Sequence, residues 1–570
     1  MTAQGPIPGQ EATRAYPVRV GRWLPAVAVA VALLYALAIG GEWAITPTSG
    51  VYLTVGRNLA EGRGMVFNGR PMPRTPPLLP ALVAGCRLLA GRNALWLLNT
   101  LMSLCAVGAA LAAMGTANRL GRSRPAPDRI RLAIGTFLMT GLSAWLFGDA
   151  TCLPPEVPLV CLFMLGVYAF VRSRTGHWAW CPVGAAALAA AACTHFLGLV
   201  LLPAVLVGVV LEWNQPQYRK RLLATLFAGA AIAAAAGLWL YAAQSGGDVP
   251  APGGPLRALW RYPSDLLAPA GWNRLAANLA RLPEAVAGAL TDQELHGVNV
   301  IPAALAVVGL AVGVWQRQWV VVLPVVGCVA CLLALRAEIG ARYLVPLLPL
   351  VAYFVLTGTH GLARTAVRWV RSGIVRRRAP RLAVVAAAGA CLVISLPKDV
   401  RRIVWARHPD FYRVYEHGKW QGVVQVSEAL ARRGRPGADT VATPEHPVVH
   451  YLTRLPVVEE PIWTDGERAI GMGDTEQIPP EAFARAAQAG SFRFLVVPTR
   501  DAAWSGPALE AVARTGAFAA PRHYADMALL ERVRGLTAWL PADAPADEAR
   551  SGPRTAGVRE SAPRPSPAAK

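Results

Sequence analysis

The sequence predicts an all-α polytopic membrane domain of about 11 transmembrane helices, with an external amphipathic-helix loop and a small C-terminal α/β domain. Hydrophobic residues make up 54% of the 570 positions, and the mean hydropathy is +0.37. This composition is too apolar for an ordinary soluble enzyme and is typical of polytopic membrane proteins. The apolar residues also gather in span-length runs, the last of which ends near residue 397.

Eleven apolar runs approach the length of about 20 residues that a helix needs to cross a bilayer. These runs are residues 23–41, 94–118, 130–148, 156–172, 178–194, 196–212, 222–243, 299–316, 319–335, 342–360 and 381–397. Basic residues gather in every second loop, which predicts a cytoplasmic N-terminus and, after an odd number of spans, an external C-terminal part. The net charge of +22 does not indicate a nucleic-acid partner, because the arginines are scattered between apolar runs rather than gathered on one soluble face.

The predicted organisation has four parts: a cytoplasmic N-terminus (1–22), a transmembrane domain (23–397), an external α/β domain (398–540) and a disordered tail (541–570). In the external domain, helix-like residues 423–433 alternate with strand-like segments such as 448–454 and 492–498. The tail is rich in Pro, Ala and Arg and has few large apolar residues, as disordered segments do. The long first external loop, 42–93, includes an amphipathic segment at 76–91, which predicts an interfacial helix.

Several ionisable residues stand close to predicted span ends on the external side. They are Glu42, Asp149, Glu156, His195, Arg336 and Arg342. Carboxylates at a membrane edge are costly unless they are solvated, paired or used in function. Structural roles stay open as well: Asp149 suits a solvated turn, Glu156 a helix N-terminus and Arg342 an interfacial anchor. For His195, a packed and hydrogen-bonded histidine is the simpler interpretation.

Together these groups suit the transfer of a sugar from a polyprenyl phosphate. Such a donor is an anion whose lipid tail lies in the bilayer, so its phosphate stays at the membrane surface. Transfer needs a cationic side chain for the phosphate and a carboxylate base for the acceptor hydroxyl. The external span ends offer both kinds of group at that boundary.

Four segments, in order along the chain, resemble the C-type multi-spanning glycosyltransferases that use lipid-linked sugars, in particular the protein O-mannosyltransferase and aminoarabinose transferase relatives. The segments are "SGVYLTVGRNLAEGRGMVFNGRPMPRTPPLLPAL" (49–82), "LPPEVPLVCLFML" (153–165), "AACTHFLGLVLLPAVL" (191–206) and "ARYLVPLLPLVAYFVLTG" (341–358). The resemblance implies an integral membrane glycosyltransferase of a bacterial plasma membrane. It implies transfer from a polyprenyl-phosphate donor to a lipid, glycan or protein acceptor on the non-cytoplasmic face, with membrane lipids as the other partners.

The residues and the resemblance together predict the site. The predicted catalytic acids are Glu156, Asp149 and Glu42; the predicted donor-phosphate ligands are Arg342, Arg74 and Arg336; further loop candidates are Tyr52, Asn58 and His195. Glu156 is the first choice for the base, because it matches the family's second acidic segment and the preceding Pro154-Pro155 stiffens its approach.

Two positions depart from the family pattern. An acid usually precedes the Ser-x-x-Tyr of the first loop, whereas this chain has Thr48, whose hydroxyl cannot act as a general base near pH 7. Thr48 also suits a helix N-cap or a turn. His195 stands where the family often has Arg, which removes a permanent charge. Either another external acid acts as the base or the chain has lost the reaction.

Two alternative functions therefore stay open. One is a non-catalytic relative that binds a lipid-linked sugar or a partner, and the other is a membrane transporter. Against the transporter, no matching pair of Gly- or Pro-broken spans recurs in two halves of the sequence.

The cysteines and acids do not indicate a metal site. All nine cysteines precede residue 398 and lie in or beside apolar segments, as packing residues do. Since no cluster of metal-ligating residues has convincing spacing, we predict no cofactor and no obligatory metal, while a divalent metal is not excluded.

Overall fold

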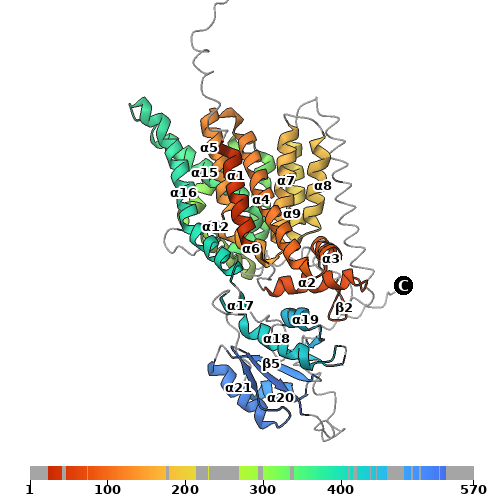
Figure 1. Cartoon of the computed structure of the whole chain (residues 1–570). Coiled ribbons are helices and arrows are strands. Elements are labelled where there is room, and N and C mark those ends of the chain that lie inside the picture. The colour runs from red at the N-terminus through yellow and green to blue at the C-terminus, as the bar shows by residue number, and fades with distance from the viewer. Residues whose placement is uncertain are drawn as a thin grey trace, which may run out of the picture.

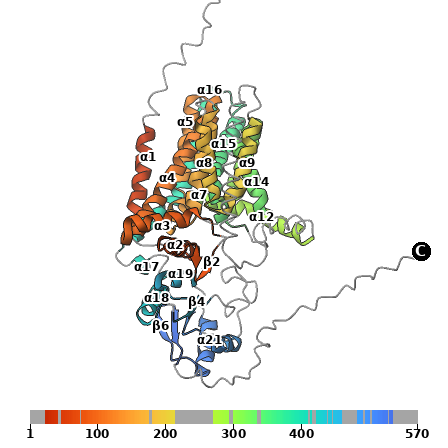
Figure 2. The same cartoon turned by 90° about the vertical axis from the view of Figure 1, so that its right-hand side faces the viewer.

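The computed structural model describes the chain over residues 23–40, 46–72, 75–174, 179–212, 229, 269–292, 299–333, 339–408, 411–414, 420–436, 438–443, 446–458, 480–489, 492–499, 502–525 and 527–533. Over these residues the chain forms a bundle of apolar helices, with a smaller part that contains a sheet at one end of the bundle (Figure 1). Two helices, α2 (Pro47–Ala60) and α3 (Leu78–Ala90), lie between the bundle and that smaller part (Figure 2).

The bundle helices lie close to the predicted spans. They are α1 (Trp23–Ala38), α4 (Ala94–Leu120), α5 (Ala126–Gly141), α6 (Ala144–Cys152), α7 (Glu156–Ser173), α8 (Trp180–Ala192), α9 (Phe196–Glu212), α13 (Val300–Trp315), α14 (Trp319–Leu333), α15 (Leu348–Ala366) and α16 (Gly373–Ala406). Three 3-10 helices flank α4 and α15: η3 (Gly91–Asn93), η4 (Gly121–Ser123) and η6 (Ala341–Leu347). The predicted seventh span, 222–243, lies outside the described residues except for residue 229.

The chain is an integral membrane protein. In the described part, four helical stretches have both the length and the apolar composition to cross a membrane: Ala94–Ser123, Glu156–Ser173, Ala341–Ala366 and Gly373–Ala406. A fifth span is added if α5 and α6, which bend by 49° at their junction, count together. Six further apolar helices are shorter. The count of eleven spans therefore stays a prediction.

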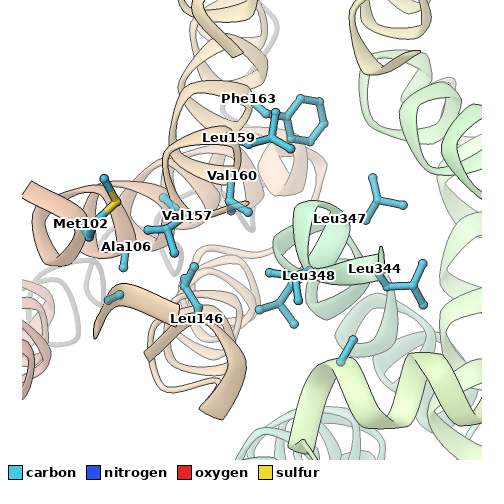
Figure 3. Close-up of a cluster of buried hydrophobic side chains, with 14 of the residues drawn as sticks. Met102, Ala106, Leu146, Val157, Leu159, Val160, Phe163, Leu344, Leu347 and Leu348 are labelled. Atoms are coloured by element: carbon cyan, nitrogen blue, oxygen red, sulfur yellow. The ribbon is translucent and has the colours of Figure 1, made fainter. Parts of the chain in front are cut away.

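Large apolar side chains fill the inside of the bundle, where α4, α6 and α7 face η6 and the start of α15. Figure 3 labels Met102, Ala106, Leu146, Val157, Leu159, Val160, Phe163, Leu344, Leu347 and Leu348 in this core. Elsewhere glycine lets two helices approach closely, as is common between membrane helices. Gly309 of α13 lies against the Phe354 carbonyl of α15, and Gly358 of α15 lies against the Leu305 carbonyl of α13.

This contact predicts different outcomes for two glycines of α15. A Cβ at Gly358 would collide with the Leu305 carbonyl, so Gly358→Ala forces α13 and α15 apart. Overpacking of this kind costs about 1–3 kcal/mol, and we expect a lower unfolding temperature in detergent. Gly361→Ala is the matched control, because its Cβ would meet only Val312, at 3.8 Å, and alanine favours the helix. Equal unfolding temperatures for the two variants would contradict the close contact.

One helix, α12 (Pro269–Thr291), lies between the predicted spans 222–243 and 299–316 and was not among the elements that the sequence predicted. Its apolar residues lie on one face and are interrupted by polar ones, so the segment has no span-length run. The C-terminal half is buried, and the Trp145 indole of α6 donates to the carbonyl of Gly288, at 2.8 Å. The helix thus supports the end of α6.

The segment between α1 and α4, which the sequence predicts to be an external loop, folds into two helices and a hairpin. These are α2 (Pro47–Ala60), β1 (Val66–Phe67), β2 (Arg70–Pro71) and α3 (Leu78–Ala90), the last of which matches the predicted interfacial helix. Gly56 of α2 packs directly on Val83 of α3. The hairpin turns at Asn68 and Gly69, whose φ values of 51° and 77° suit the tight turn that such a pair favours.

The C-terminal part contains a five-stranded sheet in the order β4-β3-β5-β7-β6. Its strands are β3 (Val441–Ala442), β4 (Val457–Val458), β5 (Phe494–Pro498), β6 (Arg522–Tyr524) and β7 (Met527–Glu531). The β3–β4 and β3–β5 pairs are parallel, and the β5–β7 and β6–β7 pairs are antiparallel. The helices of this part are α17 (Phe411–Val414), α18 (Gln421–Arg433), α19 (His446–Thr453), α20 (Pro480–Ala489) and α21 (Ala502–Arg514).

Alternate residues of β5 enter different cores. Phe494 and Val496 share a cluster with residues of α18 and α19, whereas Leu495 and Val497 share another with residues of α20 and α21. Because side chains alternate across a strand, helices cover both faces of the sheet. The strand-like residues 448–454 of the sequence analysis form α19 instead, so that interpretation was wrong.

Candidate functional site

Two of the predicted acids, Asp149 and Glu156, lie on either side of the turn between α6 and α7. α6 ends at Cys152, and Leu153 then adopts a left-handed conformation with φ 57°. Pro154 and Pro155 follow, and α7 begins at Glu156. Proline cannot continue α6 but is compatible with a helix start. The turn therefore fixes Glu156 at the N-terminus of α7, where the helix dipole favours its negative charge.

Glu156 forms an ion pair with Arg342, a residue 186 positions later in the chain. The Arg342 Nε donates to Glu156 Oε1 at 3.0 Å. The glutamate side chain is 7% exposed and the arginine side chain 44% exposed. Among the described residues, Glu156 Oε2 accepts no hydrogen bond. The Arg342 guanidinium makes one hydrogen bond to the described part of the chain, from Nε, and its two terminal nitrogens make none there. The pair therefore offers a free acceptor oxygen beside two free cationic donors.

Asp149 of α6 is the second acid beside this pair. Its side chain is half-buried, and its charge acts on both Glu156 and Arg342. Its Oδ2 atom makes no hydrogen bond to the described part of the chain. The structure thus brings two carboxylates and one guanidinium to the same end of the bundle.

The start of α2 is held against the acid turn. The Thr46 side chain caps α2 by accepting from the Ser49 backbone N–H at 3.3 Å, and the Ser49 hydroxyl donates to the Cys152 carbonyl. Thr48 is exposed in the first turn of α2. Of the two structural roles expected for Thr48, N-cap or turn residue, the N-cap role belongs to Thr46, two residues earlier, so the N-cap expectation was wrong.

Tyr52 lies one turn further along α2 and is buried. Burial, and then the nearby Glu156 carboxylate, raise the pKa of the Tyr52 phenol above its ordinary value. The phenol therefore keeps its proton at neutral pH and is a hydrogen-bond donor next to the ion pair.

His195, between α8 and α9, is also close to the ion pair. The Leu197 backbone N–H donates to its Nδ1 at 3.2 Å, so a neutral ring carries its proton on Nε2. Burial lowers the pKa of His195, while the Glu156 charge opposes that effect. At neutral pH the ring is therefore a donor without a permanent charge.

Of the remaining predicted residues, Asn58 has other partners. Asn58 donates to the Val66 carbonyl at 2.6 Å and accepts from Arg63, so it shapes the loop before the hairpin. Glu42, Arg74 and Arg336 lie outside the described residues.

The sequence analysis missed a second set of charged residues beside Asp149, on α16. Arg402 donates to the Ala144 carbonyl of α6, and Lys398 contacts Asp292 at 3.0 Å. Asp399 is 1% exposed. The predicted span ended at residue 397, whereas α16 continues to Ala406. The spacing of Asp399 and Arg402, one helical turn apart, is the signal that was available.

No three of the described His, Cys, Asp and Glu residues gather closely enough to hold a metal ion. The nine cysteines are free thiols. The metal requirement stays a prediction.

Three solved structures have this fold. The structure of ArnT from Cupriavidus metallidurans bound to undecaprenyl phosphate superimposes with a TM-score of 0.54 and 16% identity, over 91% of this chain and 99% of that one. ArnT in the apo state superimposes with a TM-score of 0.51 and 14% identity, over 90% of this chain and 98% of that one. The Archaeoglobus fulgidus oligosaccharyltransferase tethered with an acceptor peptide superimposes with a TM-score of 0.51 and 11% identity. That superposition covers 86% of this chain and 72% of the oligosaccharyltransferase.

The chain has the fold of these enzymes. The resemblance to the C-type glycosyltransferases that the sequence indicated is thereby confirmed at the level of the fold. No protein-family profile and no curated protein sequence matches the chain.

Proposed function

We propose that the chain is a membrane glycosyltransferase that transfers a sugar from a polyprenyl-phosphate donor to an acceptor on the non-cytoplasmic face. The observation that supports this most is the Glu156–Arg342 ion pair. It places a buried carboxylate and a half-exposed guanidinium at helix ends that face the first external loop. The shared fold with an ArnT bound to undecaprenyl phosphate agrees with a lipid-phosphate ligand.

In this proposal Arg342 binds two anions at once. Its Nε stays with Glu156 Oε1, while its terminal nitrogens bind the donor phosphate in the forked geometry that guanidinium groups favour. As the bond from the sugar's anomeric carbon to the phosphate oxygen breaks, Arg342 stabilises the charge that grows on the phosphate.

Glu156 is the proposed general base. The acceptor hydroxyl oxygen bonds to the anomeric carbon, its proton passes to Glu156 Oε2, and the polyprenyl phosphate leaves. Asp149 is the alternative base, because its Oδ2 is also without a partner in the described residues. Tyr52 and His195, which both lie near the ion pair, are proposed to donate hydrogen bonds to the phosphate or the sugar.

We also propose the arrangement of the whole chain. It has eleven spans, a cytoplasmic N-terminus (1–22), a transmembrane domain (23–397), an external α/β domain (398–540) and a tail (541–570), in a bacterial plasma membrane. The exposed arginines of the α15–α16 turn support this orientation, because they lie at the end of the bundle opposite the sheet (Figure 1).

Incubation with a panel of polyprenyl-phosphate sugars tests the function. Purified protein in detergent is expected to release or transfer the sugar from at least one donor, detected as free undecaprenyl phosphate by mass spectrometry. Binding of undecaprenyl phosphate with no turnover of any donor would instead support the non-catalytic alternative. Movement of an unchanged sugar lipid across vesicles would support the transporter.

A further inference from the structure

The C-terminal sheet contacts the first external loop through one side-chain amide. Asn68, at the tip of the β1–β2 hairpin, donates from Nδ2 to the Val457 carbonyl and accepts at Oδ1 from the Val457 N–H at 3.0 Å. Val457 begins β4, which is an edge strand of the sheet. Edge strands present unpaired backbone groups, and Asn68 satisfies both groups of this residue. The hairpin is therefore bonded to the sheet as a neighbouring strand would be.

Arg57 of α2 makes a second contact, with α19. Its side chain is buried, and Nη1 donates to the Tyr451 carbonyl at 2.8 Å. The guanidinium also lies over the Tyr451 ring, 5.6 Å from the centroid. Burial lowers the pKa of Arg57 to about 10, so the group stays charged at neutral pH. A buried charge without partners is costly, and the contact with α19 thus fixes this end of α2 to the C-terminal part.

The other end of α2 is fixed to the acid turn. The Ser49 hydroxyl donates to the Cys152 carbonyl, four residues before Glu156. Tyr52, between Ser49 and Arg57, lies beside the ion pair. One unbroken helix of 14 residues therefore bonds the C-terminal part at one end and the turn of Asp149 and Glu156 at the other.

We propose that the C-terminal sheet positions the acid turn through α2, and that Asn68 and Arg57 are positioning residues for the transfer reaction. This inference rests on the proposed function for its effect on turnover, but not for its effect on the acid turn itself. The hydrogen bonds of Asn68 and Arg57 go to Val457 and Tyr451, not to Glu156 or Arg342, so each residue acts through α2. Loss of either bond should therefore disturb the placement of Glu156 and lower kcat, while the KM for the donor changes little.

Hydrogen–deuterium exchange of the full chain in nanodiscs tests the coupling without a known substrate. Asn68→Gly removes the amide but keeps the positive φ that glycine adopts easily. Arg57→Met removes the donor and keeps most of the side-chain volume. We expect amides in 49–58 and 149–156 to exchange up to about tenfold faster in both variants, as one or two lost hydrogen bonds allow. Arg57→Lys keeps a donor and should restore most of the protection.

A matched control comes from the same interface. Arg454 and Glu61 form an ion pair there at 3.5 Å, but both side chains are partly exposed, so Arg454→Ala should change little. Faster exchange confined to the hairpin and to 446–458, with 149–156 unchanged, would mean that the contacts only hold two parts together and would overturn the inference. Where a donor–acceptor pair is found, Asn68→Gly should lower kcat at constant donor KM. Absence of transfer by the unsubstituted chain would count against the proposed function and leave the exchange result to decide the coupling.

Discussion

Glu156→Gln is expected to lower the turnover of sugar transfer by about 100- to 10,000-fold, the usual contribution of a well-placed general base. Glutamine keeps the size of the side chain, and its amide oxygen still accepts from Arg342 Nε. It cannot take the proton of the acceptor hydroxyl, so the chemical step suffers while donor binding stays largely intact. Initial rates at saturating donor and acceptor, together with undecaprenyl phosphate affinity, measure the two effects separately.

Asp149→Asn is the matched control, because it makes the same change at the other carboxylate of the turn. It should lower turnover less than Glu156→Gln. If Glu156→Gln were fully active and Asp149→Asn inactive, Asp149 rather than Glu156 would be the general base. Full activity of both variants would exclude a carboxylate of this turn as the base.

Arg342→Ala should weaken the binding of undecaprenyl phosphate by about 10- to 100-fold, as expected when hydrogen bonds to a charged group are lost. Arg342→Lys should restore binding only in part. The donors of an ammonium group all lie on one nitrogen, so lysine lacks the planar fork that lets arginine bond Glu156 through Nε and a phosphate through its terminal nitrogens. Titration of the purified variants with the lipid phosphate, at fixed salt, measures both.

The loss of Arg342 also leaves Glu156 buried without its cation. The double variant Glu156→Gln/Arg342→Ala removes that complication, and it should bind the lipid phosphate as weakly as Arg342→Ala does. Arg454→Ala changes an arginine of the C-terminal part and should bind normally. Unchanged binding by Arg342→Ala would mean that Arg342 is not the phosphate ligand.

Much of the bundle was predictable, because a span needs a long apolar run and such runs are visible in one sequence. The site was predictable only as separate residues. Glu156 and Arg342 were both selected, yet their ion pair depends on how η6 packs against α7, which no local pattern contains. The role of Ser49 was missed for the same reason, since its partner is a backbone carbonyl on another helix.

Other errors have local causes. Residues 448–454 are rich in β-branched and aromatic residues and suit a strand by propensity, but packing against α2 and α18 makes them a helix. Thr48 was chosen as a cap from residue type alone, whereas Thr46 has the extended backbone that a cap requires, with φ −135° and ψ 142°. The charged residues of α16 were left out of the predicted span, because a hydropathy criterion stops at the first polar residues. The helix itself continues beyond them to Ala406.

Leu153 has a consequence for how this chain can evolve. A leucine in the left-handed region is disfavoured by about 1–2 kcal/mol relative to the right-handed one, and glycine would remove that penalty. Yet the Leu153 side chain is 1% exposed and belongs to the main core, so glycine would also open a void there. A substitution at this position therefore either keeps the backbone strain or loses the packing of the side chain. Either change alters how rigidly the flanking acids are held. Adaptation of the chain to a new ligand or a new temperature would therefore proceed through neighbours of this residue, with the turn itself held nearly constant.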